Sequence, residues 1–224
     1  MMNLLENIAH TVEFGKINEK SPYPPNMKGQ DGADEYVKQA LDEGLDANTV
    51  LQEGLIIGME KIGVKFKANE VFVPQVLMSA KAMSAGMNHL KPYFNDGSVQ
   101  RKGKFVIGTV KGDLHDIGKN LVAMMLEGNG YEVIDLGVDV TAEKFIDAAN
   151  ENPGCFVGLS ALLTTTMSNM EEIVARLKEN NSEQKVFIGG APVSQQFADK
   201  IGADFFSPDP QGAIATSNEL VGAA

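Results

Sequence analysis

The sequence predicts an α/β protein in which an N-terminal four-helix bundle precedes a doubly wound, five-stranded parallel sheet of the Rossmann or flavodoxin-like type. Residues 48–94 carry apolar side chains at three- and four-residue spacing, which is typical of packed helices. From residue 104 onward, short continuous apolar runs alternate with helix-like stretches, which is typical of parallel strands covered on both faces. Residues 95–103 lack periodicity and are expected to be a linker.

The helical domain is expected to span residues 1–94. The segment SPYPPNMKGQDG, residues 21–32, holds three prolines and two glycines and should be a loop, which divides the first two helices. Four connected helices suggest a small bundle, or cap, whose methionine and leucine stripes form its core. The four candidate helices are residues 3–19, 33–43, 48–66 and 71–94.

The α/β domain is expected to span residues 104–224. Its five strand-like runs are KFVIGTV, EVIDLG, CFVGLS, KVFIGG and DFFS, in chain order. Right-handed crossovers between such strands place the ligand-binding loops at the carboxyl ends of the strands. Helical stretches are expected to begin near Ile117, Ala142, Met167, Val193 and Pro210.

Composition excludes several classes of function. The net charge of −11, from 30 acidic and 19 basic residues, would repel phosphate backbones and anionic lipids, so neither nucleic acid nor membrane is an expected partner. No apolar run approaches the roughly 20 residues of a membrane span, and the N-terminus lacks the pattern of a signal peptide. A cytoplasmic location is therefore predicted. The one cysteine, Cys155, lies in an apolar run and is expected to be a buried thiol.

The loop after the first strand, GDLHDIGKN, places one imidazole between two carboxylates. Asp113 can accept the Nδ1 proton of His115 and leave Nε2 free as a ligand for a metal. A loop histidine that simply bonds to its neighbouring carboxylate is the alternative. Zinc or iron would need three or four protein ligands, whereas a metal already held by a macrocycle would need only one.

Two other loops are expected at the same edge of the sheet. Residues 160–166, SALLTTT, are rich in hydroxyl groups. Gly189 and Gly190 lack side chains and would allow the backbone to approach a ligand closely. Neither of the two common phosphate-binding patterns, GxGxxG and GxxxxGK[ST], is present, so these loops do not predict a phosphate cradle.

These segments together resemble the cobalamin-binding protein family. GDLHDIGKN is similar to its DxHxxG signature, and GLSALLT (158–164) and IGGA (188–191) are similar to its second and third motifs. EGLIIGM (53–59) and FVPQV (72–76) resemble the helical cap of the same family. The resemblance covers nearly the whole chain. It is closest to the corrinoid proteins of anaerobic methyltransferase systems and to the matching module of cobalamin-dependent methionine synthase.

The resemblance implies that cobalamin is the cofactor and that His115 replaces its lower base on cobalt. Asp113 would then hold His115, and Thr166, which stands where methionine synthase has a serine, would hold Asp113. These three are the candidate catalytic residues, and His115 is the candidate metal ligand. The displaced nucleotide tail would enter the α/β domain.

Further contacts are implied by the same resemblance. Phe66 and Val73 would shield the upper face of the corrin, and Glu53 would reach its amide rim, although a solvated surface carboxylate is the alternative for Glu53. The hydroxyl-rich loop and the glycine pair would line the tail channel. The candidate cofactor-binding residues are Glu53, Phe66, Val73, Gly112, Asp113, Leu114, His115, Asp116, Ile117, Gly118, Ser160, Leu162, Thr164, Gly189, Gly190 and Asp209.

The implied function is a methyl carrier that shuttles a methyl group through cobalt(I) and methyl-cobalt(III). Such a chain is not catalytic alone but serves as the corrinoid subunit of an O-, N- or methanol-demethylating system. Its expected partners are a substrate:corrinoid methyltransferase, a second methyltransferase that delivers the methyl group to tetrahydrofolate or a thiol, and a reductive activating protein. The alternatives are the small cobalamin-binding subunit of an adenosylcobalamin mutase and a cobalamin-dependent sensor.

Overall fold

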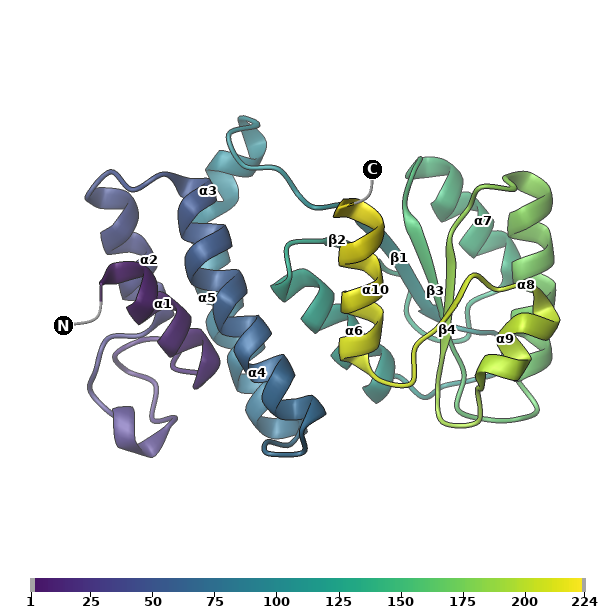
Figure 1. Ribbon diagram of the computed structural model, residues 1–224, viewed down its shortest axis with the longest axis horizontal. Helices are drawn as coiled ribbons and strands as arrows, with labels where there is room; N and C mark the ends of the chain where they lie inside the picture. Colours follow the sequence, from purple (N-terminus) through teal and green to yellow (C-terminus); the bar gives the residue numbers. More distant parts are fainter. Residues whose placement is uncertain (1–2, 223–224) are drawn as a thin grey trace. The chain divides into compact units, whose positions relative to one another are not determined.

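The computed structural model describes residues 3–222 (Figure 1). The chain forms two compact units, one with the residues up to Arg101 together with Gly128–Gly130, the other with Lys102–Glu127 and the residues from Tyr131 onward. None of the helices in the described part of the chain has both the length and the apolar character that a membrane crossing requires. The helical N-terminal region and the five-stranded parallel sheet confirm the predicted fold class.

The helical unit contains the four predicted helical segments. The third is one continuous helix whose middle turns are π-helical, and a short 3₁₀ turn interrupts the proline-rich loop. The elements are α1 (Leu4–Glu13), η1 (Pro25–Met27), α2 (Ala33–Asp42), α3 (Ala47–Thr49), η2 (Val50–Ile56), α4 (Ile57–Lys67) and α5 (Val73–Asn95).

The first helix is shorter than the sequence predicts. It ends at Glu13 because Gly15 adopts a positive φ of 71°, a conformation that terminates helices. A side chain at this position would also come within 2.6 Å of Met78, so α5 packs closely against the turn. The next segment is anchored by Lys16, whose fully buried Nζ donates a hydrogen bond of 2.9 Å to the carbonyl of Ser21.

The segment predicted as a linker folds back on α5. Val99 is buried, and its N–H donates to the carbonyl of Tyr93 at 3.0 Å. The guanidinium of Arg101 lies 4.1 Å from the ring centre of Phe94. The division into domains at residues 94 and 104 stays a prediction.

The second unit is a parallel sheet with strand order β2-β1-β3-β4-β5. Four of its helices begin at the predicted residues, and α9 begins two residues later than predicted because the Ser194 hydroxyl caps it through Phe197 N. The elements are β1 (Lys104–Thr109), α6 (Ile117–Gly128), β2 (Glu132–Asp135), α7 (Ala142–Glu151), β3 (Phe156–Ser160), α8 (Met167–Asn180), β4 (Val186–Gly189), α9 (Gln195–Ile201), β5 (Phe205–Phe206) and α10 (Pro210–Gly222).

The two faces of this sheet are packed differently. Helices α7, α8 and α9 cover one face, where Val106, Val157 and Leu159 belong to a continuous buried core (Figure 1). Helices α6 and α10 lie on the other face (Figure 1). Phe105 and Phe187 line a cavity there together with residues of these two helices. Because side chains alternate along a strand, consecutive apolar residues serve opposite faces. The second face encloses the cavity described below.

Candidate functional site

The loop between β1 and α6 presents an exposed imidazole at the carboxyl end of the sheet. His115 has 50% of its side chain exposed, and its Nδ1 lies 2.8 Å from Oδ1 of Asp113. An ionised carboxylate can only accept hydrogen bonds, so Nδ1 carries the proton and Nε2 keeps its lone pair. The imidazole is therefore fixed in the tautomer that offers Nε2 to a metal.

The buried carboxylate of Asp113 accepts hydrogen bonds from two loops, its own loop after β1 and the loop after β3. Its Oδ1 accepts from the ring and the backbone N–H of His115, at 2.8 and 3.1 Å. Its Oδ2 accepts from the Thr166 hydroxyl at 2.7 Å and from the N–H groups of Leu162 and Leu163 at 2.8 and 3.2 Å. Burial alone would raise the pKa of Asp113, but the hydrogen bonds, led by those from His115 and Thr166, hold it well below its ordinary range.

This lowered pKa predicts a pH-dependent contribution to stability. A carboxyl whose pKa is lower in the folded than in the unfolded chain stabilises the fold above the unfolded value of about 3.9. That contribution falls as the pH drops toward the folded pKa, by at most about 1.4 kcal/mol per pH unit. Urea unfolding of the cofactor-free chain between pH 5 and 3 measures it. The loss should be smaller in Asp113→Asn, and equal pH slopes for the two proteins would contradict the prediction.

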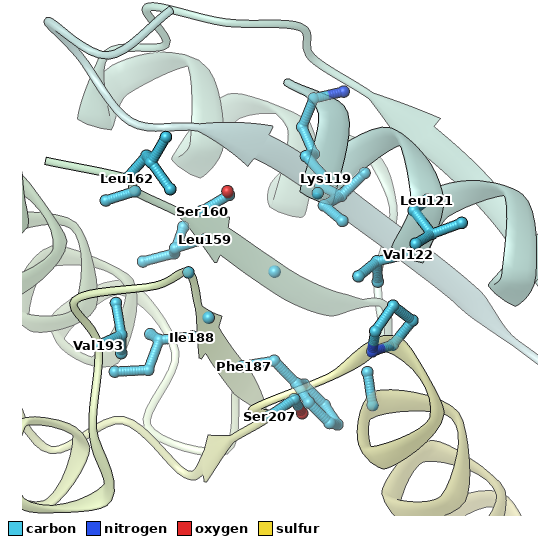
Figure 2. A pocket seen from close by; sticks show the side chains of 18 of the residues that line it. Lys119, Leu121, Val122, Leu159, Ser160, Leu162, Phe187, Ile188, Val193 and Ser207 are labelled. Atoms are coloured by element: carbon cyan, nitrogen blue, oxygen red, sulfur yellow. The ribbon is translucent and has the colours of Figure 1, made fainter. Parts of the chain in front are cut away.

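The cavity on the second face of the sheet has a volume of about 740 Å³ and lies within the α/β unit. Residues of β3, β4 and α6, including Leu159, Ile188 and Val122, surround it in Figure 2. Most of the residues predicted to bind a cofactor in this unit lie along it. They are Leu114, His115, Asp116, Ile117, Gly118, Ser160, Leu162, Gly189, Gly190 and Asp209.

Four predicted residues of this unit do not line the cavity, and they are Gly112, Asp113, Thr164 and Thr166. Asp113 and Thr166 are buried behind the imidazole, and Gly112 supports the loop with a φ of 79°. The functional roles of these residues stay predictions. Thr164 is exposed and is not among the residues that line the cavity. Asp209 lines it but also caps α10, because its Oδ1 accepts from Gly212 N at 2.8 Å.

Four residues that line the cavity were not among the predicted site residues, and they are Phe105, Ile107, Phe187 and Ser207. A glycine within a strand often marks a close approach, and Gly158 was the available signal. A Cβ at that position would meet the ring of Phe105 at 2.7 Å. The strand runs are apolar throughout, so their residue types do not reveal which side chains face the cavity.

Gly190 sets the distance between the β3 and β4 loops. Its φ of 127° disfavours any residue with a side chain, and a Cβ would lie 1.9 Å from the carbonyl oxygen of Ala161. The neighbouring Gly189 carbonyl accepts from Ala161 N at 3.2 Å, so the two loops are held together by their backbones. The close approach that the structure shows here is between two loops of the same chain, and the close approach of a ligand stays a prediction.

The surroundings of His115 fit a large, flat and mostly apolar ligand. Leu114 and Ile117 are 71% and 76% exposed, and Leu162 of the neighbouring loop is also exposed. The buried hydroxyl of Ser207, on the cavity wall, has no hydrogen-bond partner among residues 3–222. Over the same residues, no three His, Cys, Asp or Glu side chains are grouped to hold a metal ion. The donor set therefore suits a metal that brings its other ligands with it.

The three predicted residues of the helical unit are not all together. Phe66 near the end of α4 and Val73 at the start of α5 flank one turn, beside the exposed apolar side chains of Val64 and Phe72. Glu53 is exposed on η2, 13 residues before Phe66 on the same continuous helix and hence about 20 Å away. Their roles stay predictions.

Two family models described as B12 binding domains match the chain, over residues 103–211 and residues 30–91. A corrinoid protein of Desulfitobacterium hafniense (strain Y51) is 44% identical over 84% of this chain and 89% of that relative. Dimethylamine corrinoid protein 1 of Methanosarcina acetivorans is 43% identical over 83% of this chain and 88% of that relative.

Solved structures agree with these relatives. A cobalamin-binding protein of Desulfitobacterium hafniense DCB-2 matches 98% of both chains with a TM-score of 0.73 and 31% identity. The methanol:cobalamin methyltransferase complex MtaBC of Methanosarcina barkeri contains a chain that matches 99% of this chain, over 80% of its own length, with a TM-score of 0.83 and 29% identity. This chain therefore belongs to the corrinoid proteins of methyltransferase systems, whose cofactor is cobalamin or a related corrinoid.

Proposed function

We propose that the chain carries methyl groups on a corrinoid that it binds with the lower base displaced and with His115 Nε2 as the axial ligand of cobalt. The observation that carries this proposal is the exposed imidazole whose Nδ1 is bonded to the buried Asp113 carboxylate at 2.8 Å. One oriented nitrogen at the mouth of a mostly apolar cavity suits a cofactor that has a flat ring and a long tail.

When bound, the corrinoid supplies a cobalt ion that accepts a methyl group as cobalt(I) and donates it as methyl-cobalt(III). Asp113 holds the Nδ1 proton of His115 and thereby makes Nε2 a better ligand. His115 would hold the cobalt through Nε2, and the Asp113 carboxylate, 2.8 Å from Nδ1, would keep the ring in the orientation that this requires. Thr166 keeps that carboxylate ionised through its hydrogen bond of 2.7 Å.

The remaining residues of the α/β unit bind and position the cofactor. Leu114 and Ile117 offer apolar contact to the ring, and Gly189 and Gly190 leave room for the tail in the cavity. The unpartnered hydroxyl of Ser207 is available to a polar group of the tail. In the helical unit, Phe66 and Val73 would exclude water from the reactive metal.

The proposed partners follow from the membership of this chain in the corrinoid proteins of methyltransferase systems. A substrate:corrinoid methyltransferase would load the methyl group, a second methyltransferase would pass it to tetrahydrofolate or a thiol, and an activating protein would restore the reduced cobalt. The names of the relatives, which refer to dimethylamine and methanol, support methylated amines and methanol as the first donors to test.

The test is reconstitution of the purified chain with cobalamin. The visible spectrum at neutral pH should show that dimethylbenzimidazole is displaced, and the cobalt(II) form should show coupling to one imidazole nitrogen by electron paramagnetic resonance. After reduction, a methyltransferase encoded beside this chain should methylate the cobalt with dimethylamine, methanol or an aromatic methyl ether. A chain that binds no cobalamin, or that binds it with dimethylbenzimidazole still coordinated, would contradict the proposal.

A further inference from the structure

Thr109 is the last residue of β1, and it connects the sheet to the β1–α6 loop through a hydrogen bond to His115. It is fully buried, and its hydroxyl donates a hydrogen bond of 2.9 Å to the backbone carbonyl of His115. The segment between β2 and α7 holds the backbone of Thr109 through two hydrogen bonds. Thr109 N donates to Gly137 O at 2.9 Å, and Val140 N donates to Thr109 O at 3.0 Å. The hydroxyl is therefore fixed to a rigid strand end.

Asp139, in the segment between β2 and α7, holds the same loop two residues earlier. Its Oδ1 accepts from Gly112 N at 2.7 Å, and its N–H donates to the carbonyl of Asp113 at 3.0 Å. Asp139 adopts a positive φ of 54°, which an aspartate tolerates better than most residues. One residue thus makes two hydrogen bonds to neighbouring residues of the His115 loop.

We infer that Thr109 and Asp139 form a clamp, in which they act as positioning residues for His115. This inference rests on the proposed function. The Asp113 carboxylate fixes the Nδ1 end of the ring, whereas the clamp fixes the backbone from which the ring projects. The backbone at Lys111 has a separate anchor, Asn169 Nδ2, at 2.7 Å. The backbone of this loop segment is therefore fixed by hydrogen bonds both at Lys111 and Gly112 and at His115, without a bound metal.

The clamp matters because ligation depends on alignment as well as on basicity. A metal ligand must be held to within about 0.5 Å and 10–20° of its working geometry by the groups around it. Loss of an outer hydrogen bond of this kind typically costs about 10- to 100-fold in metal affinity or activity. Because Asp113 still orients the ring, we expect an effect near the lower end of that range.

The experiment compares matched variants of the full chain reconstituted with cobalamin and reduced to cobalt(II). Thr109→Val removes the hydroxyl at nearly constant volume, and Thr109→Ser restores it. Asp139→Gly removes the carboxylate without strain at positive φ, and Asp139→Asn keeps an acceptor oxygen. Ser217→Ala is the control, because Ser217 is also fully buried and its hydroxyl also donates to a carbonyl, that of Ala213 at 2.7 Å.

The readout is the ratio of nitrogen-coordinated to uncoordinated cobalt by electron paramagnetic resonance, with urea unfolding of the cofactor-free chain measured in parallel. Thr109→Val and Asp139→Gly should lower the ratio about tenfold and fivefold, whereas Thr109→Ser, Asp139→Asn and Ser217→Ala should match the wild type. If Thr109→Val does not fold, the two variants of the exposed Asp139 decide the question.

Three results would overturn the clamp. One is an unchanged ratio in Thr109→Val and Asp139→Gly at full cobalamin loading. Another is an equal drop in Ser217→Ala, which would mean that any lost buried hydroxyl has this effect. The third is a wild-type chain without nitrogen coupling, which defeats the proposed function and the clamp together. Only the first two leave the proposed function standing, so the two failures are distinguishable.

Discussion

Replacement of His115 by glycine is expected to slow methyl transfer by more than about a hundredfold while leaving the chain folded and able to take up cobalamin. Loss of an outer-shell partner alone costs about 10- to 100-fold, so loss of the ligand itself should cost more. Folding should persist because half of the side chain is exposed, and uptake should persist because the cavity is intact. The methylation rate with the partner enzyme and the cobalt potential measure the effect, and His115→Gln should behave similarly.

His89 provides the control for this experiment. Its Nε2 lies 2.7 Å from Oδ1 of Asp34 in the helical unit, so it is also a histidine paired with a carboxylate. His89→Gly should leave the visible spectrum and the potential of the reconstituted chain unchanged. An unchanged spectrum and potential in His115→Gly would show instead that His115 is not the axial ligand.

Gly190→Ala is expected to destabilise the α/β unit by about 3 to 5 kcal/mol, or to prevent its folding. The added Cβ would lie 1.9 Å from the Ala161 carbonyl, which is backbone and cannot rotate away as a side chain would. A φ of 127° adds strain that every non-glycine residue would suffer. Urea unfolding measures the loss of free energy, and weaker cobalamin binding should accompany it because Gly190 lines the cavity.

Gly202→Ala is the control for Gly190→Ala, because it introduces backbone strain at a positive φ without a steric clash. Gly202 follows α9 with a φ of 74°, and among the described residues no atom lies within 4 Å of the position where a Cβ would stand. It should therefore cost only the strain of a left-handed residue, about 1 to 2 kcal/mol. Equal losses in the two variants would mean that close contact with Ala161 is not what requires glycine at position 190.

Helix and strand positions were predictable where the local pattern carried the information. Helix starts such as Ile117, Met167 and Pro210 follow apolar runs and turn residues that are visible in the sequence. The early end of α1 was not predictable, because it depends on how Gly15 packs against Met78 from a distant helix. Periodicity shows which residues form a face but not where a tertiary contact stops the helix.

The candidate site was predictable to a similar degree. Asp113 and His115 are two residues apart, so their pairing could be expected from local chemistry, whereas Thr166 was reached only through the family resemblance. Thr109 and Asp139 were missed because their bonds go to backbone atoms. A threonine that ends a strand looks like an ordinary strand former, and no side-chain pattern marks a backbone carbonyl as its partner.

Because the two faces of the sheet are packed differently, one face mainly stabilises the fold and the other can bind a ligand. Val106, Val157 and Phe145 belong to the continuous buried core on the side covered by α7, α8 and α9, and protein cores of this kind are close-packed. The opposite face has room for a ligand, because Phe105 and Phe187 line a cavity there. Substitutions in the residues that line the cavity can therefore change ligand selectivity with little loss of stability, because the core on the opposite face is unaffected.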